Sequence, residues 1–366
     1  MKVSIARGEL LESLSVVGKG MSARSTLPIL SGILFTASGG EIQLQATDLE
    51  VSVRNTAPAL VEKEGQVVVP GKLLSDIVRS LPEAAVTIET EGETAHIRCQ
   101  HSSFTVKTLN PADFPKFPEV AVDKSIELPS STMSSMVKQV SRAVSRDETR
   151  AILTGILLVI EGPTVRMVAT DSYRLAVREI VLEKVAGEDT EVVIPGKALD
   201  EVTRLSGDSE TIVLGVSENQ IVFEFGNTVF VTRRIEGSFP NYKQLIPKES
   251  ATNAIVSGEE ITAAVKRVSL MALHNTPVKV SISVSDQTLS LSATTQDVGD
   301  ASEDLMVKAE GEDTDIAFNH GFLMDGLASA GTENVKLEVQ NHLKPGLLKT
   351  VGDEGFLYLL MPVRLG

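Results

Sequence analysis

The sequence has little of what several protein classes require. Among 366 residues it contains one cysteine and no tryptophan. One cysteine cannot form an intramolecular disulfide, which fits a reducing compartment. The longest apolar stretches, such as Gly155–Ile160, fall far short of the ~20 residues of a membrane-spanning helix. Arg7 interrupts the place where a signal peptide has its apolar segment. We therefore expect a soluble, cytoplasmic protein with no membrane partner.

Positive charge is also scarce. Lysine and arginine number 34 against 49 aspartates and glutamates, for a formal net charge of −15. This balance argues against a tight, general binder of nucleic acid, because attraction to phosphate requires a basic surface. Aromatic residues make up only 4% and do not alternate with basic ones, so stacking on single-stranded bases is not expected.

What the sequence does contain is internal repetition. Val67–Glu83 returns as Val192–Asp208 with identity at 7 of 17 positions. Pro28–Leu34 likewise returns as Ala151–Leu157, and Asp315–Ala330 occupies the same place in a fainter third copy. Because the matches keep their order, chance is a poor explanation. The sequence predicts three tandem domains, over residues 1–123, 124–248 and 249–366.

Within each copy, the periodicity of apolar residues changes in a fixed order. A helical spacing comes first, alternating strands follow, a second helix begins at Gly-Lys, and further strands close the copy. The predicted helices are 6–19, 71–80, 130–146, 196–206, 257–271 and 319–330. The predicted fold class is α+β, with two helices on antiparallel sheet in each domain.

The charges divide unevenly between these elements. The six predicted helices sum to +3, which leaves −18 on strands and loops. If the helices line one surface and the sheets face outward, a weakly basic lining sits inside an acidic shell and faces DNA without gripping it. The alternative is that helices simply favour lysine and arginine while hairpins collect acidic residues. The charges alone do not decide between the two.

Two near-matches to ligand-binding motifs do not hold. The stretch from Gly65 to Lys72 resembles a phosphate loop, but its spacing is one residue too long and the hydroxyl residue is missing. His96, Cys99 and His101 suggest a metal site, yet strand alternation sends His96 to the face opposite Cys99. A zinc site would also need a fourth ligand that the sequence does not offer. We predict no metal and no cofactor.

Catalysis is not predicted either. Asp48 and Asp171 each follow an Ala-Thr pair at the same position of their repeats. This recurrence favours a turn in which the carboxylate accepts local backbone N–H groups over a pair of acid–base catalysts. Hydrolase chemistry at either aspartate remains the enzymatic alternative.

Four stretches, together with the triplication, resemble one known family. They are Thr26–Leu34 (TLPILSGIL), Ala169–Val177 (ATDSYRLAV), Glu236–Pro247 (EGSFPNYKQLIP) and Leu360–Leu365 (LMPVRL). In this order they resemble the bacterial β sliding clamps, the processivity subunits of DNA polymerase III, and the resemblance runs the whole chain.

The resemblance implies a ring without catalytic activity. Two chains would close head to tail as a homodimer around duplex DNA, placed there by an ATP-driven clamp loader. The second hypothesis is a clamp-like peptide-binding scaffold with no DNA role, which the net charge motivates. The DNA-facing residues would be Arg24, Lys72, Arg79, Lys138, Arg142, Arg146, Lys197, Arg204, Lys266 and Arg267.

The resemblance also implies one pocket per chain for short linear motifs of the replicative polymerase alpha subunit and other clamp-motif proteins. Leucine, methionine and proline would form an apolar cleft, while arginine and asparagine would fix the peptide backbone. The deep part would be Leu153, Thr170, Ser172, Tyr173, Arg174, Leu175, Pro240, Leu245, Leu359 and Met361. A shallower arm would use Arg150, Asn319, Phe322, Leu343, Pro345, Pro362, Val363 and Arg364.

Overall fold

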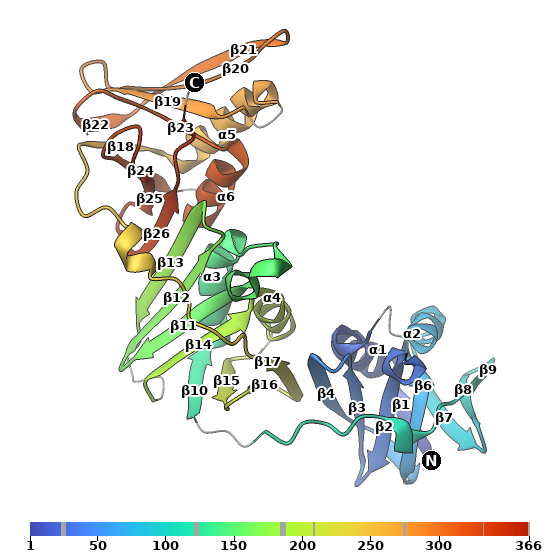
Figure 1. Cartoon of the computed structure of the whole chain (residues 1–366). Helices are drawn as coiled ribbons and strands as arrows, with labels where there is room; N and C mark the ends of the chain where they lie inside the picture. Colours follow the sequence, from blue (N-terminus) through green and yellow to red (C-terminus); the bar gives the residue numbers. More distant parts are fainter. Residues whose placement is uncertain are drawn as a thin grey trace. The chain divides into compact units, whose positions relative to one another are not determined.

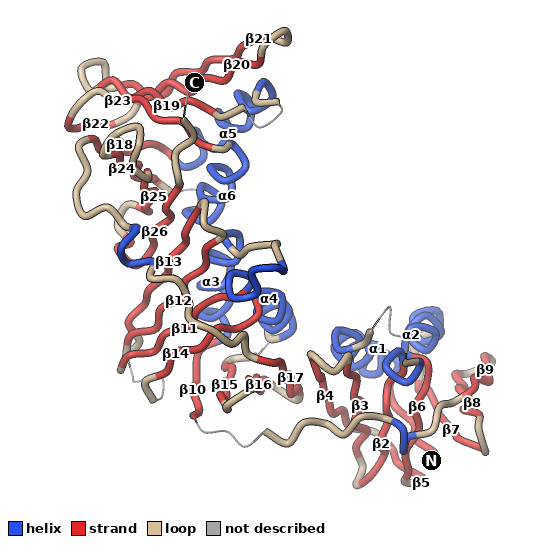
Figure 2. The backbone as a smooth tube through the Cα atoms, in the orientation of Figure 1, coloured by secondary structure: helices blue, strands red, loops and turns tan. Residues whose placement is uncertain are grey.

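The computed structural model of the chain describes residues 1–22, 27–120, 124–183, 188–207, 209–273, 276–331 and 333–364 (Figure 1). The chain forms two compact units. Unit 1 comprises Met1–Ser131 and Glu201–Arg234, and unit 2 comprises Thr132–Asp200 and Ile235–Gly366. Figure 2 shows that strands make up most of each unit, with the α-helices gathered on one face of the sheets.

The elements repeat three times in one order: a strand, a helix, three strands, another strand, a second helix and three final strands. The first repeat contains β1 (Lys2–Ala6), α1 (Arg7–Val17), β2 (Gly32–Ser38), β3 (Glu41–Thr47), β4 (Val51–Pro58), the additional strand β5 (Leu60–Lys63), β6 (Gly65–Pro70), α2 (Gly71–Ser80), β7 (Ala85–Glu91), β8 (Thr94–Cys99) and β9 (Ser102–Lys107).

The second repeat follows the same order without an additional strand. It contains β10 (Lys124–Pro129), α3 (Ser130–Val140), β11 (Gly155–Glu161), β12 (Thr164–Thr170), β13 (Arg174–Val181), β14 (Thr190–Pro195), α4 (Gly196–Leu205), β15 (Thr211–Val216), β16 (Gln220–Phe225) and β17 (Thr228–Arg233).

The third repeat again has one additional strand, β22. It contains β18 (Thr252–Ser257), α5 (Gly258–Val268), β19 (Val278–Ser283), β20 (Thr288–Thr295), β21 (Gly299–Met306), β22 (Lys308–Gly311), β23 (Thr314–Phe318), α6 (His320–Ala330), β24 (Asn334–Val339), β25 (Gly346–Thr350) and β26 (Asp353–Leu360). The predicted fold class, two helices on antiparallel sheet in each repeat, is confirmed. The strand that precedes each first helix was not predicted.

Local sequence explains why the second helices begin where they do. In the first two repeats a strand ends at proline, at Pro70 and Pro195, which has no N–H to continue a strand ladder. The next residue is the first of the helix. In α2 the buried residues Leu74, Ile77 and Val78 then follow helical spacing and face the core.

Three predicted helices, over 6–19, 130–146 and 257–271, run past the ends of the observed α1, α3 and α5. The difference is largest for α3. The sequence predicts a helix over 130–146, whereas α3 covers Ser130–Val140 and a 3-10 turn follows at Ser141–Ala143. The backbone N–H of Ser145 donates to the carbonyl of Leu153, 2.9 Å away. Ser145 is thus bonded outside the helix, and the apolar spacing that continues to Val144 belongs to the turn and not to α3.

Each unit contains two antiparallel sheets. In unit 1 the strand orders are β5-β1-β7-β8-β9 and β10-β15-β16-β17-β4-β3-β2-β6. In unit 2 they are β14-β11-β12-β13-β26-β25-β24-β18-β22 and β21-β20-β19-β23. Helix α1 lies beside α2 in unit 1, and α5 lies beside α6 in unit 2 (Figure 1).

The large sheet of each unit crosses a repeat boundary. In unit 1, β17 of the second repeat pairs with β4 of the first, with Phe230 opposite Val53. In unit 2, β26 of the third repeat pairs with β13 of the second, with Leu359 opposite Leu175. In both cases the last strand of one repeat pairs antiparallel with the same strand of the preceding repeat. Backbone hydrogen bonds therefore join consecutive repeats.

Helix α6 packs on β25 and β26 through a close approach at Gly326. A Cβ atom at this position would lie 2.7 Å from the ring of Tyr358, which is completely buried. Since neither the helix backbone nor the ring has space to retreat, only glycine fits here.

We expect Gly326→Ala to lower the free energy of unfolding by about 1–3 kcal/mol, because the added methyl group overpacks a closed core. Urea denaturation followed by circular dichroism measures this. The control is Gly18→Ala, whose methyl group would meet Met21 at an ordinary 3.7 Å. Equal urea midpoints for the two variants would contradict this account of the helix contact.

Candidate functional site

An apolar cluster forms where β13 and β26 pair. Leu175 on β13 lies opposite Leu359 on β26, and Leu347 on β25 lies on the other side of Leu359. Tyr242 and partly buried neighbours such as Ile246 pack against them. We call the N-terminal end of β13, the C-terminal end of β26 and the following residues 361–364 the β13–β26 surface.

The turn before β13 fixes the direction in which its side chains project. Asp171 Oδ1 accepts the N–H groups of Tyr173, at 2.9 Å, and of Arg174, at 3.0 Å. Ser172 adopts φ 80°, in the left-handed region. This geometry directs Tyr173 outward, where 61% of it is exposed. Because Asp171 accepts local backbone N–H groups, the predicted turn role is confirmed.

Asp48 forms the same turn in the first repeat. Its Oδ1 accepts the N–H groups of Glu50 and Val51, and Leu49 has φ 78°. The two aspartates thus hold equivalent turns in different repeats. In the third repeat Asp297 has the positive φ, 62°.

Arg174 is the buried charge at the centre of the surface, with only 9% of the residue exposed. Its Nε donates to Asp171 Oδ2 at 3.0 Å, and its Nη1 donates to Asp325 Oδ2 at 2.5 Å and to the Tyr358 hydroxyl at 3.2 Å. Its guanidinium carbon also lies 4.5 Å from the centre of the Phe322 ring. Buried charges need such partners to offset lost hydration, and these contacts hold Arg174 in one position.

Tyr358 remains neutral within this network. Burial raises the pKa of its hydroxyl well above the ordinary value of 10, although the neighbouring Arg174 guanidinium pulls that pKa down. The hydroxyl therefore serves as a hydrogen-bond partner and not as a titrating acid at physiological pH.

Aromatic rings connect the turn before β13 with α6. Tyr173 stacks on Phe322 with ring centroids 6.2 Å apart and an interplanar angle of 25°. Phe322 lies in the first turn of α6, and its N–H donates to the side chain of Asn319, the N-cap. This contact links residues predicted for the deep part with residues predicted for the shallow arm.

The C-terminal segment lies against both ends of the surface. The Met361 N–H donates to the carbonyl of Tyr173 at 2.9 Å, and the Val363 N–H donates to the carbonyl of Ala317 at 2.8 Å. Met361 remains 40% exposed. The segment is thus held by its backbone, while its methionine side chain reaches solvent.

The predicted pocket residues divide into a buried floor and an exposed rim. Leu153, Thr170, Leu175 and Leu359 are each at most 5% exposed. Ser172, Pro240, Leu245, Leu343 and Arg364 are exposed, and Pro345, Pro362 and Val363 are half-buried. Arg150 donates to Ser172 at 3.0 Å and to Asp147 at 3.1 Å, so its guanidinium is held beside the turn.

Asp325 and Tyr358 were not predicted as site residues, although both contact Arg174. Asp325 lies 151 residues from Arg174 in sequence. An aspartate on an amphipathic helix carries no local signal that a distant arginine will reach it. Only the pairing of β13 with β26 brings these side chains together.

The predicted DNA-facing residues other than Arg24 are all exposed and lie on helices, on the turns that follow them, or beside them. Arg24 lies outside the described residues. Five of the others are paired with carboxylates: Arg79 with Asp76, Arg142 with Asp325, Lys197 with Glu148, Arg204 with Glu201 and Arg267 with Glu303. This pairing weakens the field that the cations present to solvent.

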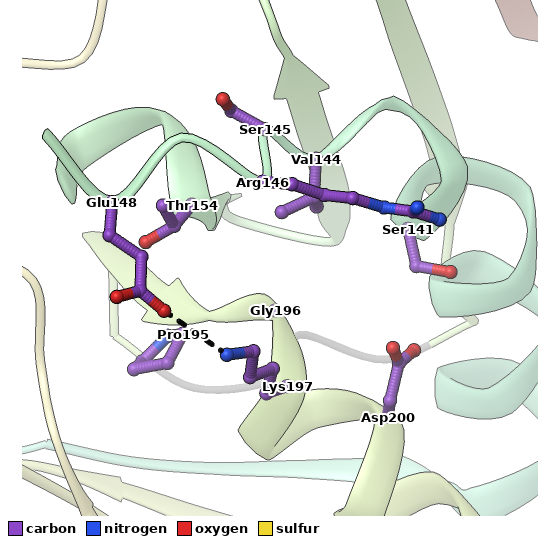
Figure 3. A pocket seen from close by; sticks show the side chains of 10 residues that line it. All are labelled: Ser141, Val144, Ser145, Arg146, Glu148, Thr154, Pro195, Gly196, Lys197 and Asp200. Atoms are coloured by element: carbon purple, nitrogen blue, oxygen red, sulfur yellow. Dashed lines mark hydrogen bonds and ion pairs between the residues drawn. The ribbon is translucent and has the colours of Figure 1, made fainter. Parts of the chain in front are cut away.

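Arg146 and Lys197 line one cavity of about 450 Å³ at the start of α4 (Figure 3). Glu148 and Asp200 line it too, and Lys197 Nζ lies 3.5 Å from Glu148 Oε1. Two acidic and two basic side chains leave this cavity without net charge.

The cysteine and the histidine considered as metal ligands lie on one strand of the first repeat. Cys99 is buried on β8, and His96 lies on the opposite face, where its Nδ1 contacts the Thr105 hydroxyl at 3.0 Å. Within the described ranges, no group of three or more metal-binding side chains converges. None of the described helices is both long and apolar enough to span a membrane.

Comparison with known proteins places the whole chain in one family. Models of the N-terminal, central and C-terminal domains of the DNA polymerase III beta subunit match residues 1–118, 127–241 and 243–364. The chain is 37% identical to the beta sliding clamp of Streptomyces coelicolor, with 100% of both chains covered. It is 34% identical to that of Staphylococcus aureus, covering 100% of this chain and 99% of the relative.

Solved structures of sliding clamps match the fold of the whole chain. The DNA polymerase sliding clamp of Bacillus subtilis matches over 100% of both chains, with a TM-score of 0.96 and 30% identity. The Pseudomonas aeruginosa clamp bound to griselimycin matches over 100% of both chains, with a TM-score of 0.95 and 26% identity. The chain therefore belongs to the bacterial β sliding clamps, the non-catalytic processivity subunits of DNA polymerase III.

Proposed function

We propose that this sliding clamp closes as a head-to-tail homodimer around duplex DNA and recruits its partners through the β13–β26 surface. The observation that carries the ring is the rule by which repeats are joined. Strand β4 of the first repeat pairs with β17 of the second, and β13 of the second pairs with β26 of the third.

By the same rule, two edge strands of this chain are expected to pair with strands of a second copy. The equivalent strand of the third repeat is β21, and the last strand of the first repeat is β9. Each lies at the edge of its sheet. Unpaired edges expose backbone N–H and C=O groups, which favours pairing with another chain. Antiparallel pairing of β21 with β9 of a second copy continues the series and closes a ring with heterologous contacts.

The helices beside the joins support this continuation. At the first join Lys19, on the turn after α1, pairs with Glu201 on α4 at 3.2 Å. At the second join Arg142, on the turn after α3, pairs with Asp325 on α6 at 3.4 Å. Both acids are the sixth residue of their helix.

At the proposed third join the equivalent residues are Leu270, on the turn after α5, and Asp76, the sixth residue of α2. Leu270 is 71% exposed, and Leu73 on α2 is 49% exposed. A large apolar side chain exposed at the position of the other joins' cation, with a second on the helix of the equivalent acid, indicates a surface that is buried on association. The join between molecules is therefore proposed to be apolar where the joins within the chain are ion pairs.

We expect Leu270→Glu to produce monomers, because it places a carboxylate opposite Asp76 of the second copy. Leu270→Lys is expected to preserve the dimer, since it restores the charge pattern of the other two joins. Sedimentation velocity at micromolar concentration measures the mass. Leu60→Glu, on the opposite edge strand β5, controls for a new surface charge. A Leu270→Glu variant that sediments as the wild type would contradict the proposed join.

The balanced charges on the helical face suit a clamp that is held by topology. Few unpaired cations mean few counterions released and little direct affinity for phosphate. A clamp loader, which we propose as a partner, would open the ring and place it on DNA.

Retention on DNA is therefore expected to depend on the form of the DNA. Clamp loaded with a clamp loader and ATP onto nicked circular duplex should stay bound through gel filtration at high salt. Cutting the circle once should release it, because an open end lets the ring slide off. Retention that survives linearisation would contradict topological binding, and absence of any loading would favour the scaffold without a DNA role.

The β13–β26 surface is proposed to bind short motifs of the polymerase alpha subunit and other proteins. Its buried leucines form an apolar floor beside the exposed side chains of Met361, Leu245 and Tyr173. Arg174 is held in position for the polar part of a peptide. The similar clamp of Pseudomonas aeruginosa was solved with griselimycin bound, and we propose that this chain binds griselimycin at the same surface.

Met361→Glu is expected to weaken griselimycin binding at least tenfold, because it puts a charge on the exposed rim of an apolar surface. Calorimetry measures the affinity. Leu175 is unsuitable for this test, since a charge at a residue 1% exposed would disrupt folding. The control is Val181→Glu, at the far end of β13, which is 72% exposed. Equal loss in both variants, or none in Met361→Glu, would refute the assignment.

A further inference from the structure

A second cavity, of about 540 Å³, adjoins the shallow arm of the β13–β26 surface. It lies in unit 2 and shares Leu343, Val363 and Arg364 with that arm. Its other walls include residues 314–317 of β23 and the turn before them. The volume falls within the range of pockets that take a short peptide segment or small ligand. A peptide that leaves the shallow arm therefore has space to continue.

One wall of this cavity is a sheet edge. Strand β23 is the last strand of its sheet and pairs on one side with β19, with Asp315 opposite Ser281. The carbonyl of Ala317 accepts the Val363 N–H, so it faces away from β19. Because backbone groups two residues apart in a strand point the same way, the N–H and C=O of Asp315 also face away from β19. Because Val363 already occupies the Ala317 carbonyl, the edge offers the backbone groups of Asp315 to an extended chain.

The charge of the lining selects one kind of segment. Glu312, Asp313, Asp315 and Arg364 line the cavity, which gives it a net charge of −2 with histidine neutral. Lys279 pairs with Asp315 at 2.9 Å. Within the described part of the chain, no cation lies within 4.0 Å of the carboxylates of Glu312 or Asp313. Asp313 Oδ1 accepts the Val284 N–H at 2.7 Å, so Asp313 Oδ2 and the Glu312 carboxylate are the oxygens proposed for a ligand cation.

We propose that this cavity binds the segment flanking a docked motif, as an extended chain that carries lysine or arginine. The proposal rests on the motif-binding role of the β13–β26 surface. Backbone pairing along β23 aligns the segment, and Glu312 and Asp313 select its charge. Partners with the same apolar core would then differ in affinity according to the charge of their flank.

Short peptides test this directly. All share the core Leu-Ala-Leu-Phe, whose side chains suit the apolar floor, and carry Lys-Ala-Lys, Ala-Ala-Ala or Glu-Ala-Glu either before or after it. In one of the two positions we expect the lysine flank to bind about 3- to 10-fold tighter than the alanine flank at low salt, and the glutamate flank more weakly. Fluorescence anisotropy with the full-length dimer measures these affinities.

The double variant Glu312→Gln, Asp313→Asn should remove the gain from lysine and leave the alanine-flanked peptide unchanged. Asn at 313 can still accept the Val284 N–H, which Asp313 Oδ1 accepts at 2.7 Å. The matched control is Glu310→Gln, an exposed residue of β22 that does not line the cavity. Amide exchange at Asp315 should slow only when the lysine-flanked peptide is bound.

Two failures are distinguishable. If the alanine-flanked core binds but lysine brings no gain in either position, or a gain that the double variant retains, the cavity proposal is overturned while motif binding stands. If the core fails to bind to the wild type and griselimycin also fails to bind, the motif-binding role of the surface is overturned, and the cavity proposal with it.

Discussion

The structure depends on one constraint, the antiparallel pairing of the last strand of one repeat with the fourth strand of the repeat before it. It turns three copies of one unit into continuous sheets, so the joints are as strongly hydrogen-bonded as the repeats themselves. It also creates the β13–β26 surface, because Leu175 and Leu359 meet only through this pairing. Each copy alone would have unsatisfied edges, which explains why the repeats occur in series.

A buried charge, Arg174, fixes the geometry of the β13–β26 surface. Arg174 is satisfied by two carboxylates and one phenol while its plane lies near an aromatic ring. Removing any one partner would leave a buried polar group with an incomplete set of hydrogen bonds, at a cost of about 1–3 kcal/mol. The network ties β13, α6 and β26 together, so the apolar floor and the aromatic rim keep a fixed relation. A rigid surface loses less entropy when a flexible peptide binds to it.

The sequence predicted what local periodicity determines. The six helices, the α+β class and the turns at Asp48 and Asp171 follow from spacing and turn chemistry, and the structure confirms them. The predicted helices over 6–19, 130–146 and 257–271 end too late, because in each case a 3-10 turn directly follows the α-helix. Asp325 and Tyr358 were missed since their meeting with Arg174 depends on register between distant strands. The residues of the predicted pocket were assigned by family resemblance. The spacing of apolar residues along the chain would not have distinguished them from ordinary core residues.

The recurring turn before the fourth strand of each repeat shows how one copy of a repeated element can diverge. In the first repeat the turn at Asp48 serves only to reverse the chain, and in the third a glutamine, Gln296, replaces the aspartate. In the second repeat the same backbone presents Tyr173 and Arg174. Under the proposed function, one copy of a duplicated element acquired a recognition role while the others preserved the architecture. Gene duplication followed by divergence of a single copy gives a symmetric scaffold an asymmetric chemistry.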